Sequence, residues 1–252
     1  MLERYAFQGV REIERLTGPV RQKSIVEFGP GDTLTAGLAL LAAGASSYTS
    51  LDRFVPNYSR PAAKRWYVGV REGWTAAFPE RSWPADLDPV AFPESYRDRV
   101  AHIAGAVEDA SSPKRFDIVT SWQVGEHVDD IQAFADLTAA LLLPGGVAIH
   151  RVDFGPHDRW QSSYADPWLF LRFPSVVWRM MGSNRGYPNR RRHHEFLDAW
   201  DAAGLSIECA DTSRFTHMGR LRGRFKSMPS SSLMTESTVY ICRDKAYRVP
   251  AS

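Results

Sequence analysis

Two acidic residues and two glycines stand where strand-like segments end, and their spacing could hold a nucleoside. Glu27 closes one β-branched run, and Gly29 and Gly31 follow it before an apolar helix-like segment. Glycines at such a turn allow a tight bend and let a ligand approach the backbone. Asp52 closes the next run, where a carboxylate can accept hydrogen bonds from both hydroxyls of a ribose. A dinucleotide fingerprint would need a third glycine at Leu34, and a P-loop is excluded because no Gly-Lys-Ser/Thr follows.

These residues require an alternation of strands and helices to position them. Helix-like periodicity is found at residues 3–16, 33–43, 129–143 and 193–204. Strand-like runs occupy residues 24–29, 47–52, 99–105, 116–122, 147–153, 205–211 and 237–244. The pattern predicts an α/β fold whose seven-stranded sheet is mostly parallel, with an antiparallel last strand.

The chain is expected to form a single domain over residues 1–252. Its hydrophobic content of 44% and aromatic content of 12% exclude a disordered chain and allow a full core. Three stretches interrupt the alternation and are interpreted as insertions at residues 53–98, 154–192 and 212–236. We expect the first to be irregular or helical and to lie on the rim of the sheet, outside the core.

Composition also bears on the location and partners of the chain. The longest apolar stretch, residues 36–45, is too short to cross a bilayer, so no membrane association is expected. Two cysteines, Cys209 and Cys242, cannot form a disulfide framework and fit a reducing cytoplasm. The formal net charge is only +2, yet residues 159–226 hold eleven arginines and one lysine against six acidic residues. An acidic or hydroxylated ligand would suit that basic half.

Four segments follow one another along the chain as Val26-Glu27-Phe28-Gly29-Pro30-Gly31, Asp52, Phe116-Asp117-Ile118-Val119 with Glu126-His127-Val128, and Leu142-Leu143-Pro144-Gly145-Gly146. In order and spacing they resemble the motifs of class I S-adenosylmethionine-dependent methyltransferases over about residues 20–153. The resemblance implies a Rossmann-like, doubly wound sheet and S-adenosylmethionine as cofactor. It places Glu27, Gly29 and Gly31 around the methionine part, Asp52 at the ribose, Val107 and Glu108 at the adenine, and Ser121 and Gln123 beside the sulfonium.

The acceptor chemistry depends on groups at the ends of the fourth and fifth strands. The cofactor supplies the electrophile, so the protein must position the acceptor and, for a hydroxyl, provide a base. The fourth strand ends in TSWQ (120–123) and lacks the Asn/Asp-Pro-Pro-aromatic motif of amino methyltransferases. We therefore expect O-methylation of a small molecule, a saccharide or natural product. His150 is the first candidate for the base and His157 the second, with Asp153 between them.

A second resemblance concerns a metal and the cap. The segment Gln123-Val124-Gly125-Glu126-His127 is similar to the Glu-x-x-Glu-His pattern by which some class I O-methyltransferases hold Mg²⁺. It implies Glu126, His127 and either His150 or Asp153 as ligands, and a metal-free site is the preferred alternative. Residues 154–192 resemble the cap of small-molecule and sugar methyltransferases, with an Asn-Arg-x-Arg element at 189–192.

Other function classes remain as alternatives. An RNA methyltransferase would need a basic groove or an appended RNA-binding module, and no such module is recognisable, so nucleic acid is not the expected partner. A non-catalytic binding protein of the same fold would bind the cofactor without turnover. A dehydrogenase is the weakest alternative because the glycine fingerprint is incomplete. The oligomeric state is left open, with a homodimer as one option.

Overall fold

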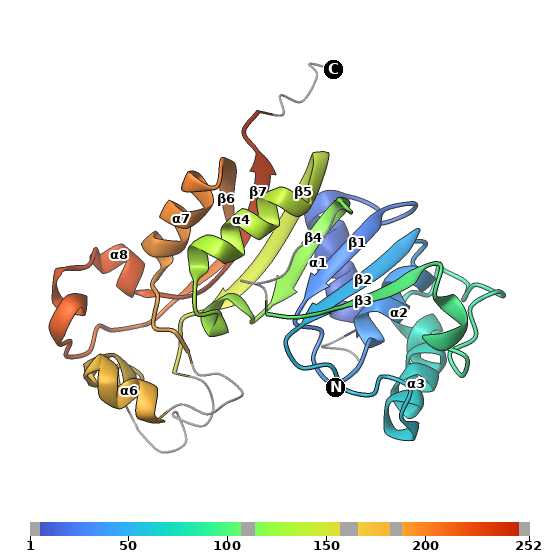
Figure 1. Ribbon diagram of the computed structural model, residues 1–252, viewed down its shortest axis with the longest axis horizontal. Coiled ribbons are helices and arrows are strands. Elements are labelled where there is room, and N and C mark those ends of the chain that lie inside the picture. The colour runs from blue at the N-terminus through green and yellow to red at the C-terminus, as the bar shows by residue number, and fades with distance from the viewer. Residues whose placement is uncertain (1–5, 107–113, 157–165, 182–187, 247–252) are drawn as a thin grey trace. The chain divides into compact units, whose positions relative to one another are not determined.

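The computed structural model describes residues 6–106, 114–156, 166–181 and 188–246, and its strands form one seven-stranded sheet in the order β3-β2-β1-β4-β5-β7-β6 (Figure 1). The strands are β1 (Ser24–Phe28), β2 (Ser47–Asp52), β3 (Val100–Ala104), β4 (Phe116–Trp122), β5 (Leu142–Asp153), β6 (Leu205–Arg214) and β7 (Thr235–Asp244). The helices are α1 (Gln8–Thr17), α2 (Thr35–Ala42), α3 (Pro61–Ala77), α4 (Ile131–Leu141), α6 (Ser175–Met181), α7 (His193–Ala202) and α8 (Ser230–Leu233). The predicted Rossmann-like mixed sheet is confirmed.

The chain divides into two compact units, the first made of Met1–Ser121 with Ala140–Ile149 and the second of Trp122–Ala139 with His150–Ser252. In the first unit, β1 pairs in parallel with both β2 and β4, and β2 pairs in parallel with β3. α2 packs against β2 and α3 (Figure 1). In the part of the chain that the structure describes, no helix is long and apolar enough to span a membrane.

The insertion at residues 53–98, which the sequence predicted to lie on the rim of the sheet and outside the core, contributes to the core. It contains α3, a helix of 17 residues that begins at a proline. Tyr67, Val70 and Trp74 on α3 are fully buried, and the Trp74 ring packs against Phe7 with centroids 6.4 Å apart. The three residues follow helical spacing, so one face of α3 belongs to the core of the first unit.

β5 begins earlier than predicted. The sequence Pro144-Gly145-Gly146 suggested a break before a strand at 147–153, whereas the strand already starts at Leu142, directly after α4. A Cβ atom at Gly146 would lie only 3.0 Å from the carbonyl oxygen of Phe116 and 3.1 Å from that of Asp117. Glycine at this position therefore serves close backbone packing inside the first unit rather than strand termination.

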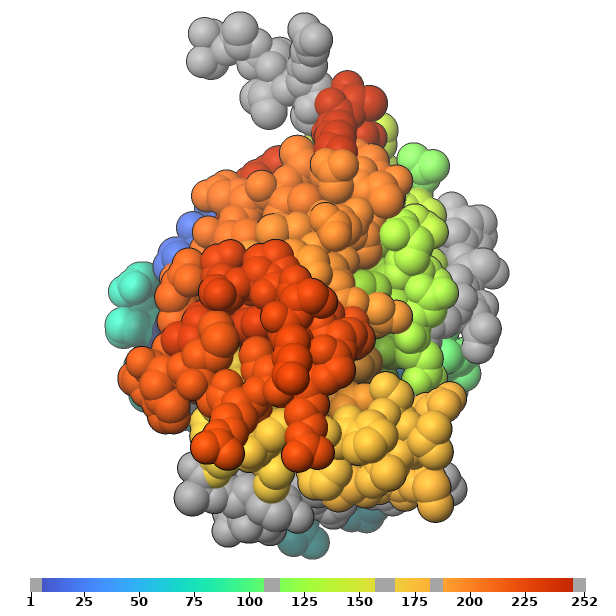
Figure 2. Space-filling model, turned by 90° about the vertical axis from the view of Figure 1, so that its left-hand side faces the viewer, coloured from blue at the N-terminus to red at the C-terminus, as the bar shows by residue number. Residues whose placement is uncertain are grey.

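The second unit is built on the antiparallel pair β6–β7, against which α7 packs. Beside it, a cluster of buried side chains joins the segment 168–178 to the segment 225–233; its members are Trp168, Phe170, Leu171, Trp178, Phe225 and Leu233. On the face shown in Figure 2, the segment around α8, in red, and the segment around α6, in gold, adjoin each other. Two of the predicted insertions thus share one small core.

Candidate cofactor and acceptor sites

The glycine turn after β1 has the backbone that ligand approach requires. Gly29 and Gly31 have φ values of 65° and 75°, a region that residues with a side chain rarely adopt. The Gly29 amide donates to the carbonyl oxygen of Leu51 at 2.8 Å, which ties the turn to the end of β2. A Cβ atom at Gly31 would meet no atom within 4 Å, so open space lies beside the turn.

Glu27 is a buried carboxyl group at the carboxyl end of β1. It is 5% exposed, and its Oε2 accepts a hydrogen bond from the Tyr48 hydroxyl. Burial raises the pKa of Glu27 to about 7; the Tyr48 hydrogen bond lowers it, and the charge of Asp52 raises it further. A cation next to this carboxyl group would favour its ionised form.

Asp52 lies half-buried at the carboxyl end of β2. Its Oδ1 accepts from the Phe54 amide at 2.8 Å, and its backbone oxygen accepts from the Gly105 amide at 3.0 Å. The carboxylate is therefore oriented at the same end of the sheet as the Gly29–Gly31 turn.

A row of polar side chains crosses four neighbouring strands of the first unit, and the sequence analysis did not find it. The strand register aligns Thr120 with Glu27, Glu27 with Ser50, and Ser50 with His102. The Ser50 hydroxyl and His102 Nδ1 are 2.6 Å apart, while burial lowers the pKa of His102. Because the polar residues of each strand are unremarkable alone, only the register makes the row recognisable.

Tyr58 is a second residue that sequence reasoning missed. Its ring packs edge-to-face on His102 at 5.4 Å, and its buried hydroxyl has no hydrogen-bond partner in the described part of the chain. Burial raises the pKa of this hydroxyl, and the charges of Asp52 and Glu27 add to the effect. His102 Nε2 is likewise buried without a described partner. Two buried polar atoms whose residues feel the charge of Asp52 thus have no described hydrogen-bond partner.

Four further residues were predicted to contact the cofactor, two at the sulfonium and two at the adenine. Ser121 is fully buried on β4 and is in register with Phe28 of β1. Gln123 has a left-handed φ of 58°, and its amide donates to the Arg151 carbonyl at 2.9 Å in the second unit. Val107 and Glu108 lie outside the described residues.

The short 3-10 helix Gly125–His127 of the second unit is clamped by Asn189. The Asn189 amide nitrogen Nδ2 donates to the carbonyl oxygens of Gly125 and Val128, both at 2.9 Å. Glu126 is 3% exposed, and no described residue donates a hydrogen bond of good geometry to its carboxylate oxygens. Burial raises the pKa of Glu126 well above its usual value, and the charge of Asp153 adds to this.

The predicted metal ligands do not form a cluster. Among the described residues, no group of three or more His, Cys, Asp or Glu side chains is arranged to hold a metal ion. Glu126 and Asp153 are close enough to affect each other electrostatically, whereas the His150 ring is engaged elsewhere. The donor set that the structure describes does not fit Mg²⁺ at the predicted residues.

His150 lies in the interior rather than at an open acceptor site, which corrects the prediction of a general base. The side chain is 0% exposed and stacks on Trp200 with centroids 5.0 Å apart. The Phe134 ring packs edge-on against it with centroids 4.9 Å apart, and Thr138 Oγ1 is 3.3 Å from Nε2. Burial lowers the pKa of His150 to about 3. The run VAIHRVD forms a buried strand, so its histidine points into the core.

The other two predicted catalytic residues are Asp153 and His157. Asp153, at the end of β5, is half-buried, and its Oδ1 accepts from the Gly155 amide at 2.7 Å. His157 lies outside the described residues.

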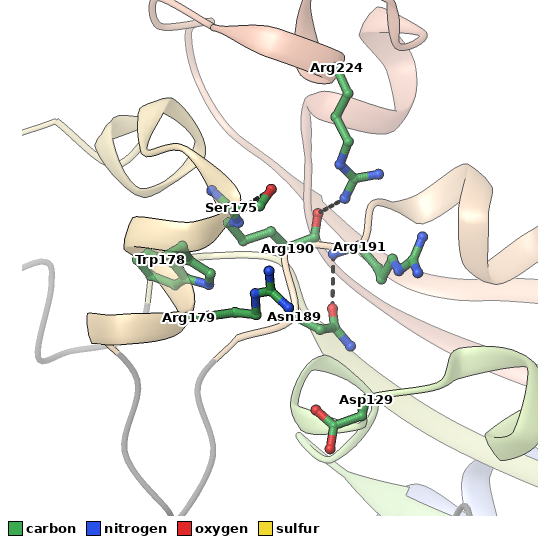
Figure 3. A pocket seen from close by; sticks show the side chains of 8 residues that line it. All are labelled: Asp129, Ser175, Trp178, Arg179, Asn189, Arg190, Arg191 and Arg224. Carbon is green, nitrogen blue, oxygen red and sulfur yellow. Dashed lines mark hydrogen bonds between the residues drawn. The ribbon is translucent and has the colours of Figure 1, made fainter.

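A cavity of about 310 Å³ opens within the second unit (Figure 3). Ser175 and Trp178 of α6 and the loop residue Asn189 line it, together with Asp129. Four arginines complete the lining, Arg179, Arg190, Arg191 and Arg224. The predicted cap and the predicted final insertion therefore contribute to one pocket.

The chain is similar to a known protein family in sequence. A sequence model described as a methyltransferase domain matches residues 2–210. The chain therefore belongs to the methyltransferase-domain family, is an S-adenosylmethionine-dependent methyltransferase, and uses S-adenosylmethionine as its cofactor. No curated protein matches the chain.

Solved structures share the fold at low sequence identity. An S-adenosylmethionine-dependent methyltransferase from Mesorhizobium loti is 15% identical, with 92% of this chain and 96% of that chain covered and a TM-score of 0.51. A TehB-like methyltransferase from Corynebacterium glutamicum is 14% identical, with coverages of 94% and 87% and a TM-score of 0.47. The Burkholderia thailandensis 1,6-didemethyltoxoflavin-N1-methyltransferase is also 14% identical, with coverages of 94% and 76% and a TM-score of 0.49.

Proposed function

We propose that this methyltransferase transfers a methyl group to a hydroxyl of a small molecule, a saccharide or a natural product. The observation that carries the proposal is the cavity of about 310 Å³ in the second unit. Its volume falls within the range of small-molecule sites. Its lining combines the largely buried Trp178 indole with the Ser175 hydroxyl and the Asn189 side chain.

The acceptor atom is proposed from the end of β4. Residues 120–123 read Thr-Ser-Trp-Gln and lack the Asn/Asp-Pro-Pro-aromatic motif that binds an amino group in enzymes acting on adenine or glutamine. A hydroxyl, in contrast, needs only orientation and a proton acceptor. The absence of the motif and the polar cavity therefore support oxygen as the methylated atom.

The cofactor contacts of the first unit are proposals of the same kind. Glu27 would face the ammonium group of the methionine part, and such a cation would restore the charge of its carboxylate. Asp52 would accept hydrogen bonds from the ribose hydroxyls, and Gly29 and Gly31 would allow the backbone to approach. Val107 and Glu108 at the adenine, with Ser121 and Gln123 at the sulfonium, complete the set.

Proton removal is the remaining chemical task. When bound, the cofactor would supply an electrophilic methyl group to the acceptor oxygen, and the hydroxyl proton would need an acceptor. Asp153 is the described residue proposed to accept it, and His157 is the other candidate. His150 is not proposed, because its ring is enclosed by Trp200 and Phe134.

The test is turnover over a panel of sugars, phenols, hydroxy acids and matched amines, with formation of S-adenosylhomocysteine as the readout. Mass spectrometry and NMR of the product identify the methylated atom. Methyl ethers formed from hydroxyl acceptors support the proposal. Methylation of the amines alone would replace it with nitrogen transfer.

A further inference from the structure

The pocket of the second unit carries more guanidinium groups than its own carboxylates neutralise. Arg179, Arg190, Arg191 and Arg224 line it; of the described carboxylates, Asp129 lines it as well and Glu195 pairs with Arg191 and Arg224. The charges are brought together from three segments, α6, the 189–191 loop and the turn at 223–227 (Figure 3). Among the described residues, four arginines and one aspartate therefore line the pocket.

Glu195 is shared and cannot balance both of its partners. Its Oε1 accepts from Arg191 Nη1 at 2.7 Å and from Arg224 Nη1 at 2.9 Å. Although burial raises the pKa of Glu195, the hydrogen bonds from Arg191, the Arg192 amide and Arg224 lower it overall. The carboxylate is thus ionised and fully engaged, and one charge stands against two guanidinium groups.

Arg190 is held as a fixed cation beneath the pocket. It is 6% exposed, and its guanidinium donates to the Phe173 carbonyl at 2.7 Å and to the Ser175 hydroxyl at 3.1 Å. The group also lies 5.3 Å from the ring centroid of Trp178. Arg190 has a left-handed φ of 61°, a strained conformation for a residue with a side chain. The Phe173 carbonyl and the Ser175 hydroxyl are neutral acceptors that orient the guanidinium.

Arg179 is the guanidinium that remains available to a ligand. It is exposed on α6, and no described residue gives it a hydrogen bond or an ion pair. Figure 3 shows its side chain extending from α6 toward Asn189, across the cavity that both residues line. A guanidinium without a described partner, near a second fixed positive charge, can donate hydrogen bonds to an oxyanion.

We propose that this pocket binds an anionic oxygen group, a carboxylate or a phosphate, carried by the acceptor. Arg179 would donate to the oxyanion directly, while Arg190, Arg191 and Arg224 supply the positive field and Asn189 and Trp178 shape the pocket. This inference rests on the proposed function for the statement that the acceptor carries the group, whereas binding of the anion itself rests on the pocket alone.

The experiment titrates the full-length protein with inorganic phosphate and, separately, with malonate, by calorimetry in a chloride buffer of constant ionic strength. Saturable binding of one probe per chain is expected. Arg179→Gln is expected to weaken it about tenfold or more, because a charge-assisted hydrogen bond is lost. Arg179→Lys, which keeps the charge, should lose less. The matched control is Arg220→Gln, because Arg220 is exposed in the same unit and does not line the pocket.

The outcomes are distinct. Selective binding of phosphate indicates a phosphate ester, and selective binding of malonate indicates a carboxylic acid. No saturable binding of either probe, or equal weakening by Arg179→Gln and Arg220→Gln, would overturn the inference. Binding of S-adenosylhomocysteine is measured on the same samples. If S-adenosylhomocysteine binds but neither anion does, only the proposed anion site is rejected. If the methylated acceptor proves to be a hydroxyl compound without a charged group, the proposed link between the pocket and the acceptor is rejected.

Discussion

Asn189 donates a hydrogen bond from its side-chain amide to the backbone oxygen of Gly125, at 2.9 Å. The same nitrogen reaches the carbonyl of Val128, and the Asn189 amide N–H donates to the Glu126 carbonyl at 2.6 Å. One residue of the predicted cap thereby replaces the hydrogen bonds that a turn after a strand would otherwise make to water. Three residues further along, the Arg192 guanidinium likewise donates to the backbone oxygens of Phe154, Leu233 and Thr235.

Asn189→Ala is therefore expected to lower the free energy of unfolding by about 1–3 kcal/mol, because two carbonyl oxygens lose their donor. Urea denaturation at neutral pH measures the change. Asn57→Ala serves as the control, since the exposed Asn57 side chain accepts a hydrogen bond from the Ser59 amide within its own loop. Equal losses of stability from the two substitutions would show that the hydrogen bonds from Asn189 Nδ2 contribute no more than those of an exposed asparagine.

Asp52→Ala is expected to weaken binding of S-adenosylhomocysteine about tenfold or more, because hydrogen bonds between a charged acceptor and the ribose are worth about 1.5–3 kcal/mol. Isothermal calorimetry measures the affinity. The matched variant is Asp98→Ala, at an exposed aspartate of the same unit. Unchanged affinity in Asp52→Ala would remove Asp52 from the proposed cofactor site.

The elements that sequence patterns identified are those with a local signal. β2 and β4 have the predicted bounds, and in β4 the β-branched run 118–120 marks the strand. α7 ends just before Gly204, which takes a left-handed φ of 80°. α3 was placed outside the core because proline and charged residues surround its apolar face. Its burial depends on Phe7, which is distant in sequence.

The candidate site residues also divide into those with a local sequence signal and those brought together only by the fold. Glu27, Asp52 and the two glycines lie at strand ends, a position that spacing along the chain already indicates. Tyr58 and His102 could not be identified, because only strand register and packing bring them next to Asp52. His150 was misplaced for a related reason: being next to the end of a strand does not say which face of the sheet a side chain occupies.

Glu27 is expected to make stability fall as the pH rises. The folded protein keeps this proton up to about pH 7, whereas the unfolded chain releases it near 4.5, so the folded state binds more protons between these values. The contribution is present at low pH and is lost by about pH 7. Relative to the wild type, Glu27→Gln should gain about 2 kcal/mol between pH 5 and pH 8.

Urea denaturation of both proteins without cofactor at the two pH values measures that gain. The comparison cancels the other titrating groups, including Glu126, because they are common to both proteins. A constant difference between the two proteins would mean that Glu27 is not buried with a raised pKa. Saturating S-adenosylhomocysteine should reduce the difference, if the ammonium group of the ligand pairs with the carboxylate.

His150 provides the sharpest distinction between a catalytic and a structural histidine. His150→Ala removes a ring that stacks on Trp200 and packs edge-on against Phe134, and it is expected to cost about 2–4 kcal/mol of stability through the cavity left behind. His150→Phe retains an aromatic ring and should restore most of that stability. Once an acceptor is found, His150→Phe should also keep turnover within about threefold, because the buried imidazole contacts no acceptor. Loss of turnover in a stably folded His150→Phe protein, with S-adenosylhomocysteine affinity intact, would return the general base to His150.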